Sequence, residues 1–215
     1  MTKNMDIAQV LEKRKVHLAL KRLMDVVVSG CALFVLWPAL LLIAAAIKLD
    51  DPGPVFYRQV RVGKNGKTFR IFKFRTMVVD ADKKGLQITV GRDNRITRVG
   101  AFLRKTKLDE LAQLINVFTG EMSFVGPRPE VPRYVEMYTP YQRQVLLVRP
   151  GITDYASIAY RNENDMLEGA PDPERMYIDV IMPDKIELNM KYLREISPLA
   201  DIRLILNTII AVIKE

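Results

Sequence analysis

The feature that most constrains this chain is a run of 22 residues without a charged side chain, residues 26–47. At about 1.5 Å per residue, a straight helix of that length would be roughly 33 Å long, which is enough to cross a lipid bilayer. The run lies too far from the N-terminus, and is too long, to be an ordinary cleaved signal peptide. Hydropathy alone therefore predicts a membrane-spanning helix.

Two features of the same segment favour another arrangement. Pro38 lies in the middle of the run, where it removes a backbone donor and clashes with the preceding turn. A spanning helix carries its excess of basic residues on one side, but here both flanks are basic: Lys13, Arg14, Lys15, Lys21 and Arg22 before the run, and Lys48, Arg58 and Arg61 after it. Both flanks reach the same side if the segment enters one leaflet, bends at Trp37-Pro38 and returns. The residues alone leave both arrangements open.

The remaining sequence predicts one α+β unit that is mostly helical. Residues 55–62 and 68–74 alternate around a glycine-containing turn, which indicates a β-hairpin. A helix in two pieces, with a break near Thr106, is expected over 98–119. Further helices are expected at 7–24, at 139–148, at 184–194 and along an apolar stripe near the C-terminus, and loops at 123–132 and 162–173. The basic helix at 7–24 fits an anionic membrane surface.

Basic side chains are concentrated in the first part of the chain. The net charge is +8; residues 1–149 hold 26 basic and 13 acidic side chains, and residues 150–215 hold 7 and 12. This asymmetry indicates an anionic partner for the first part, although a solvated basic surface would have the same composition. One cysteine, Cys31, and one histidine, His17, exclude a disulfide scaffold and a Cys/His metal cluster.

Asp109 and Glu110 are the most informative pair of polar residues. Thr106 and Asp109 have the spacing of a capping box, in which Asp109 closes a helix start and Glu110 is a surface charge. The alternative uses the same helix start, whose free N–H groups favour a phosphate and an ionised carboxylate. Asp109 could then attack phosphorus, and Glu110 could bind Mg²⁺ held against the same phosphates. Three neighbouring cations could neutralise such a substrate: Arg104, Lys105 and Lys107.

The sequence contains neither a P-loop nor a dinucleotide-binding glycine motif, so a phosphate site must be built from cations, helix ends and metal. Arg128 lies between two prolines, in a stiff loop that could aim its guanidinium at a phosphate or hold it against loop carbonyls. Arg149, before Pro150, presents the same two possibilities. Lys73 and Arg75 alternate with phenylalanines and belong either to the solvent face of a strand or to the site.

Taken together, these segments resemble the monotopic polyprenyl-phosphate phosphoglycosyl transferases, bacterial sugar transferases that start O-antigen, capsule and glycoprotein glycan synthesis. The resemblance covers nearly the whole chain, including Pro38 within the apolar run. The segments that carry it are KRLMD at 21–25, DPGPVFYRQ at 51–59, FKFRTM at 72–77, RKTKLDEL at 104–111, MSFVGPRP at 122–129 and RPGIT at 149–153.

The resemblance implies a reaction in which a UDP-sugar gives its sugar 1-phosphate to undecaprenyl phosphate and UMP is released. It makes Asp109 the covalent nucleophile and Glu110 the residue that supports Mg²⁺. It places Lys73 and Arg104 in the polar lining of the site. With these two, the cations expected to bind the substrate phosphates or nucleotide are Arg75, Arg128 and Arg149.

The resemblance also implies a re-entrant segment at 22–49 that bends at Trp37 and Pro38. Residues 1–50 would then form an N-terminal helix and a re-entrant membrane hairpin, and residues 51–215 a cytoplasmic catalytic domain with interfacial helices. Such a monotopic protein would lie on the cytoplasmic face of the bacterial inner membrane and bind no nucleic acid. A homodimer and downstream glycosyltransferases are the possible protein partners.

Two segments depart from the resemblance. The bend of the re-entrant helix is usually Ser-Pro, whereas here it is Trp37-Pro38. After RPGIT the commonest members continue with Gly-Trp-Ala-Gln-Val-Asn-Gly, whereas this chain has a different sequence over 154–164. This loop therefore does not identify the sugar. A non-enzymatic adaptor that holds anionic lipid through the basic patch is the alternative function, and it would tolerate the substitution Asp109→Asn.

Overall fold

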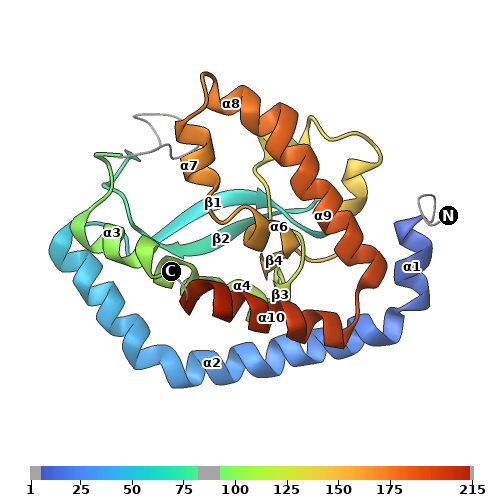
Figure 1. Ribbon diagram of the computed structural model, residues 1–215. Helices are drawn as coiled ribbons and strands as arrows, with labels where there is room; N and C mark the ends of the chain where they lie inside the picture. Colours follow the sequence, from blue (N-terminus) through green and yellow to red (C-terminus); the bar gives the residue numbers. More distant parts are fainter. Residues whose placement is uncertain (1–5, 82–92, 214–215) are drawn as a thin grey trace.

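The computed structural model describes residues 6–81 and 93–213. Within this part of the chain, helices surround two short pairs of β-strands, and a long helix follows one edge of the molecule (Figure 1). The mostly helical α+β fold expected from the sequence is therefore confirmed.

The N-terminal segment forms two helices, α1 (Ile7–Lys13) and α2 (Lys15–Asp50). Arg14 separates them because its backbone leaves helical geometry, with φ −110° and ψ 21°. The prediction of one helix over 7–24 is therefore wrong. Ile7 and Leu11 of α1 are buried in the main core, so this helix packs against protein instead of lying free on a membrane surface.

α2 stays helical through Pro38 and ends at Asp50, shortly before Pro52. Figure 1 shows that the helix changes direction along its length as it passes beneath the rest of the molecule. Proline removes one donor and bends a helix, but helical turns continue on both sides of it here. The hairpin expected at Trp37-Pro38 is thus corrected to a bent continuous helix, while its re-entrant topology in a membrane stays a prediction.

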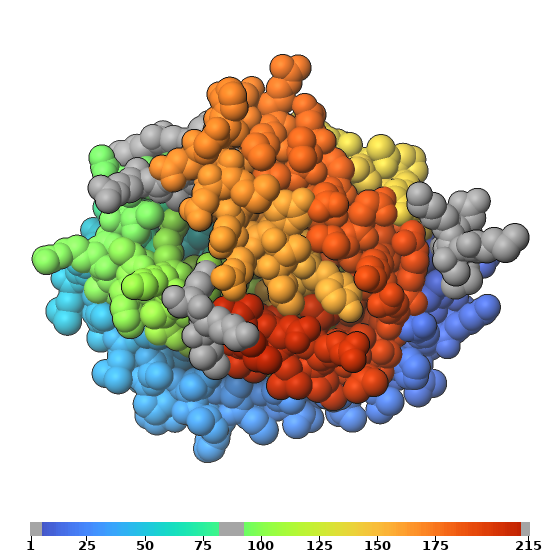
Figure 2. All heavy atoms as spheres, in the orientation of Figure 1, coloured from blue at the N-terminus to red at the C-terminus, as the bar shows by residue number. Residues whose placement is uncertain are grey.

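The most apolar part of α2 is uncovered. Only 6 % of its 18-residue window is buried, and by length and composition the helix could cross a membrane. Phe34, Leu42 and Leu49 are 79 %, 73 % and 87 % exposed. The last helix, α10 (Pro198–Ile213), lies beside α2 along one edge of the molecule (Figure 2). It also exposes large apolar side chains. We call the exposed apolar side chains of α2 and α10 together the apolar face; those that define it are Phe34, Leu42, Leu49, Leu199, Leu206, Ile209 and Ile210.

The β-strands form one antiparallel and one parallel pair in the described residues. β1 (Phe56–Val62) and β2 (Thr68–Phe74) make the expected hairpin, which is confirmed. β3 (Ser123–Val125) and β4 (Gly151–Thr153) pair in parallel, within segments where the sequence predicts a loop and a helix end. A strand pair this short carries no recognisable alternation in the sequence.

The other helices of the described chain are mostly short. They are η1 (Lys64–Gly66), α3 (Arg98–Lys105), η3 (Leu108–Gln113), α4 (Leu114–Thr119), α5 (Pro132–Val135), η4 (Gln142–Leu147), α6 (Tyr155–Ala159), α7 (Glu163–Glu168), α8 (Pro173–Met176), η5 (Tyr177–Ile181) and α9 (Met182–Glu195). The predicted helix at 184–194 is confirmed by α9 and the apolar C-terminal helix by α10. The predicted helix at 139–148 is present as the 3-10 helix η4, whereas the predicted loop at 162–173 contains the helix α7.

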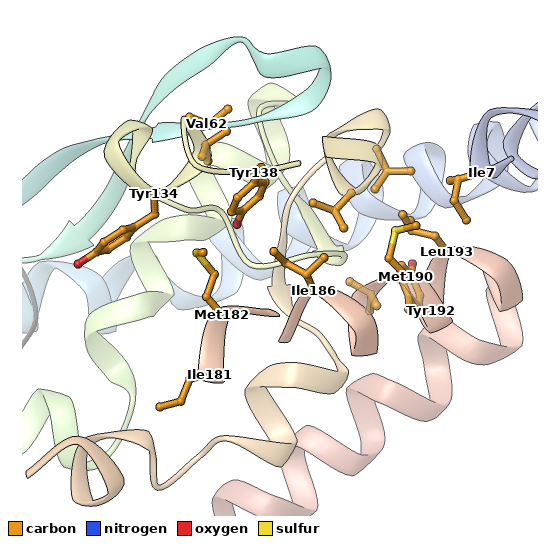
Figure 3. Packing of buried hydrophobic residues seen from close by; sticks show 14 of the residues in the cluster. Ile7, Val62, Tyr134, Tyr138, Ile181, Met182, Ile186, Met190, Tyr192 and Leu193 are labelled. Atoms are coloured by element: carbon orange, nitrogen blue, oxygen red, sulfur yellow. The ribbon is translucent and has the colours of Figure 1, made fainter. Parts of the chain in front are cut away.

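α9 is the centre of the main hydrophobic core. Figure 3 shows Met182 and Ile186 facing Tyr134 and Tyr138, while Ile7 of α1 lies near the far end of α9. Hydrogen bonds also join α2 and α9 to α10. Asp201 of α10 accepts hydrogen bonds from Tyr192 of α9 (2.7 Å) and from Lys21 of α2 (2.6 Å). The core therefore joins segments that precede and follow the long apolar helix.

Candidate active site

A cavity of about 970 Å³ opens between the β1–β2 hairpin, η3 and helices α6, α7 and α9. A volume of this size is typical of sites for small organic ligands. Its lining brings together seven of the residues singled out in the sequence for a phosphate site: Lys73, Arg75, Arg104, Lys107, Asp109, Glu110 and Arg128. These residues come from three separate segments, so the site exists only in the folded chain.

The turn before Asp109 differs from the capping box that the sequence predicts. Thr106 ends α3, and its hydroxyl donates to the carbonyl of Phe102 (2.8 Å). Lys107 then adopts the left-handed conformation (φ 56°) and precedes η3 without capping it. Asp109 is therefore not paired with Thr106.

The 3-10 geometry of η3 also changes which side chains are buried. The sequence predicts a buried face of Leu108, Leu111, Leu114, Ile115 and Phe118; of these, Leu114 is buried, whereas Phe118 is exposed. Ala112, Gln113 and Asn116 are buried instead. A 3-10 helix has 3.0 residues per turn, so an α-helical periodicity drifts out of register along it. The same rotation leaves Asp109 and Glu110 lining the cavity.

Glu110 is held between two cations from different segments. Its Oε1 accepts from Lys73 Nζ of β2 (2.8 Å) and from Arg128 Nη2 (2.5 Å), and its Oε2 accepts from Arg128 Nη1 (3.3 Å). Burial by itself would raise the pKa of Glu110, but Arg128 and Lys73 hold it well below the usual value. For Lys73, burial disfavours the charged form and lowers the pKa, while the attraction of Glu110 opposes that lowering. Glu110 is therefore an ionised carboxylate with a fixed orientation.

The carboxyl group of Asp109, next to Glu110, has different surroundings. Its side chain is 9 % exposed and makes no hydrogen bond or ion pair with any residue in the described ranges. Burial raises the pKa of this carboxyl, while the nearby charges of Lys73 and Arg104 oppose that rise. A buried carboxylate without a partner, surrounded by cations in a cavity, is available to a ligand.

The other three cations expected to bind the substrate, Arg104, Arg75 and Arg149, have different surroundings. Arg104 points toward the site and donates from Nε to Thr76 Oγ1 (2.8 Å). Arg75 lines the cavity, but its guanidinium forms an ion pair with Asp51 (2.8 Å) and so joins β2 to the end of α2. Arg149 lies in a separate small hollow beside α2, where its Nε donates to the carbonyl of Gly120 (2.8 Å). Arg149 does not line the cavity, and its expected role in substrate binding stays a prediction.

Sequence reasoning missed the role of Asp154. This residue is fully buried, accepts the backbone N–H of Ser157 (2.6 Å) at the start of α6, and accepts the N–H of Arg128 (3.0 Å). Aspartate is among the preferred N-cap residues, so a helix start at this position has a sequence signal. The bond to Arg128 has no sequence signal, because it joins positions 26 residues apart.

The structure offers limited means of holding a metal. The described residues contain no group of three or more His, Cys, Asp or Glu side chains suited to a metal ion. Glu110 Oε2 takes only a long hydrogen bond from Arg128 and lies next to Asp109 in the cavity. Mg²⁺ commonly uses one or two carboxylates with substrate phosphates and water, so this donor set fits an ion that arrives with a phosphate substrate.

Comparison with known proteins gives consistent matches. Residues 16–215 match the family described as bacterial sugar transferase. The chain is 40 % identical over 198 residues to the UDP-glucose:undecaprenyl-phosphate glucose-1-phosphate transferase of Escherichia coli strain K12, covering 90 % of this chain and 40 % of that protein. It is 36 % identical over 197 residues to the UDP-N-acetylgalactosamine-undecaprenyl-phosphate N-acetylgalactosaminephosphotransferase of Aeromonas hydrophila (90 % and 44 %).

A shorter relative matches over nearly its whole length. The exopolysaccharide production protein PSS of Rhizobium leguminosarum bv. phaseoli is 40 % identical over 202 residues, which is 90 % of this chain and 95 % of that protein. The chain thus spans less than half of the E. coli and Aeromonas relatives. On these matches, the chain that builds this cavity belongs to the bacterial sugar transferase family.

Proposed function

We propose that the protein transfers a sugar 1-phosphate from a UDP-sugar to undecaprenyl phosphate, with Asp109 as the covalent nucleophile. The observation that carries the proposal is the buried carboxylate of Asp109, which has no partner among the described residues and faces a cavity lined by Lys73, Arg104 and Arg128. The names of the E. coli and Aeromonas relatives support the same two substrates.

In the proposed first step, an Asp109 oxygen attacks the phosphorus that carries the sugar. The bond from that phosphorus to the bridging oxygen breaks, UMP leaves with the electron pair, and an acyl-phosphate forms on Asp109. In the second step, a phosphate oxygen of undecaprenyl phosphate attacks the same phosphorus. The Asp109 carboxylate is released and the lipid diphosphate sugar is the product.

The cations around Asp109 account for its reactivity in this proposal. Phosphoryl transfer depends mostly on positioning and on neutralising charge on the phosphate oxygens. Lys73 and Arg104 oppose the rise in the pKa of Asp109, so they favour the ionised nucleophile. Glu110, with its charge fixed by Lys73 and Arg128, would hold Mg²⁺ together with the diphosphate, and the ion would supply further charge neutralisation.

The arrangement around α2 supports a re-entrant segment on the cytoplasmic face of the inner membrane. α1 precedes the apolar run, yet Ile7 and Leu11 share a core with residues of α9, which follows it. Lys21, near the start of α2, pairs with Asp201 of α10. A spanning helix would place a bilayer between these partners. We therefore propose that both ends of α2 lie on one side and that the apolar face dips into one leaflet, where the lipid substrate lies.

A covalent-capture experiment tests the proposal. Purified protein, given a panel of UDP-sugars without lipid, should release UMP up to one equivalent and gain the mass of one sugar phosphate. Addition of undecaprenyl phosphate should restore the original mass and allow turnover, and excess EDTA should stop it.

The matched variants are Asp109→Asn and Asp179→Asn. Asparagine is nearly isosteric with aspartate but a far poorer nucleophile, so Asp109→Asn should show neither mass gain nor turnover. Asp179 is 62 % exposed and outside the cavity, so its variant should behave as the wild type. Full turnover by Asp109→Asn would refute the covalent route, and no UMP release by the wild type with any UDP-sugar would favour the lipid-binding adaptor.

A further inference from the structure

The loop that carries Arg128 is attached to the segment that follows β4. The N–H of Gly126 donates to the carbonyl of Thr153 (3.1 Å), and the N–H of Gly151 donates to the carbonyl of Pro127 (3.0 Å). Beyond these bonds the chain reaches Arg128, whose neighbours are both proline and lack an N–H donor. The Arg128 N–H is therefore the donor of this Pro-Arg-Pro segment, and Asp154 Oδ2 accepts it at 3.0 Å.

Asp154 is suited to hold that N–H in place. It is fully buried, and its other oxygen, Oδ1, accepts the N–H of Ser157 (2.6 Å), which fixes the rotamer of the carboxylate at the start of α6. α6 in turn packs against α9, the central helix of the core. The backbone of Arg128 is thus joined through Asp154 to α6 and, through α6, to the main hydrophobic core.

The side chain of Arg128 extends from this fixed backbone to Glu110. Both of its terminal nitrogens donate to Glu110, and a bidentate bond of this kind depends strongly on direction. A small shift of the Arg128 backbone would therefore misalign the guanidinium. We infer that Asp154 is a positioning residue that sets Arg128 against Glu110, an inference that rests on the proposed phosphoglycosyl transfer at this site.

The substitution Asp154→Asn should remove one of the two hydrogen bonds of Asp154 and keep the other. Asparagine is as good a helix N-cap as aspartate, so one side-chain oxygen still accepts from Ser157. Its amide NH₂ replaces the second acceptor and cannot accept from the Arg128 N–H. The variant should therefore keep α6 and its melting temperature close to those of the wild type but lose the bond to Arg128. Asp154→Ala removes both bonds.

Two measurements test the inference. In amide hydrogen exchange, the Arg128 N–H should be protected in the wild type and exchange much faster in Asp154→Asn. In the UMP-release assay, Asp154→Asn should lower kcat by roughly ten- to a hundredfold, with a smaller change in KM. In an Arg128→Ala background, Asp154→Asn should cause almost no further loss, because it acts through Arg128.

Asp172 provides the matched control. It caps α8 through the same bond, to the N–H of Arg175 (3.0 Å), and lies outside the cavity. Asp172→Asn should change neither measurement. Retained protection of Arg128, an unchanged kcat, or additive losses in the double variant would overturn the inference. If the wild type releases no UMP, the proposed function fails, and the exchange result alone decides whether Asp154 positions Arg128.

Discussion

Glu110 owes its charge to its two partners. Burial alone favours the neutral acid, but Lys73 and Arg128 reverse that preference and lower its pKa well below 4.5. The ionised form is therefore stabilised by folding. Stability from this group is fully present above pH 4.5 and is lost as the pH falls through the lowered pKa.

The substitution Glu110→Gln should reveal that contribution. At pH 7 the variant leaves Lys73 and Arg128 without a carboxylate, so its free energy of unfolding should fall by about 2 kcal/mol. The deficit should shrink as the pH falls below 4.5, because the unfolded wild type then binds a proton at Glu110 while the folded protein keeps this carboxyl ionised until its lowered pKa is reached. Guanidinium unfolding in detergent at several pH values measures it. A deficit that stays constant down to pH 3 would show that Glu110 is not held ionised.

Arg104 and Arg149 should respond differently to alanine substitution. Arg104 lines the cavity and opposes the rise in the pKa of Asp109, so Arg104→Ala should lower the UMP-release rate by about a hundredfold. Arg149 bonds to the carbonyl of Gly120 away from the site, so Arg149→Ala should mainly lower the melting temperature and leave the rate per folded molecule within about threefold. Equal loss of rate in both variants would return Arg149 to the site.

Among the elements, the parallel pair of β3 and β4 supports the loop that carries Arg128. The backbones meet at Gly126 and Gly151, so closely that a Cβ on Gly151 would lie 2.1 Å from the Gly126 nitrogen. No side-chain adjustment can relieve a clash between backbone atoms. Glycine at 151 is therefore required by a tertiary contact.

Gly151→Ala should destabilise the protein by about 3 kcal/mol or more and lower the rate of transfer. Gly169 is a suitable comparison, since a Cβ there meets its nearest atom at 3.9 Å. Gly169→Ala should change the free energy of unfolding by less than about 0.5 kcal/mol. Chemical unfolding of both variants in the same detergent measures the difference. Similar free energies of unfolding in the two variants would argue against the close approach of the Gly126 and Gly151 backbones.

At the scale of the whole molecule, one helix connects the apolar face with the candidate active site. α10 contributes Leu206 and Ile209 to the apolar face, and its Thr208 and Ala211 line the cavity. Residues on one helix thus reach both the proposed membrane surface and the proposed site. This geometry suits a reaction in which one substrate is a lipid and the other is soluble.

The proposed topology can be tested in intact cells. In a Cys31→Ser background, cysteines at Glu12 and Lys64, both exposed and on opposite sides of the apolar run, should both resist a membrane-impermeant thiol reagent. Both should react after the cells are permeabilised, which controls for accessibility. Labelling of the Glu12→Cys probe alone in intact cells would establish a spanning helix and contradict the re-entrant arrangement.

The sequence by itself determined the features that depend on local pattern. The uncharged run of 22 residues required an exposed apolar helix, alternation around a glycine turn produced the β1–β2 hairpin, and residues 109–110 marked the site. Local chemistry is sufficient here because each signal lies within one element.

Only the tertiary structure decided the features that depend on distant contacts. The 3-10 start of η3 gave Asp109 a cavity in place of a capping partner, and ion pairing assigned Arg75 to Asp51. The Gly120 carbonyl held Arg149 away from the site, and Asp154 reached Arg128 from 26 residues along the chain. An arginine or lysine is the same residue in the sequence whether its partner in the folded protein is a carbonyl, a carboxylate or a substrate. Its partner is fixed by packing, which residue type and spacing do not encode.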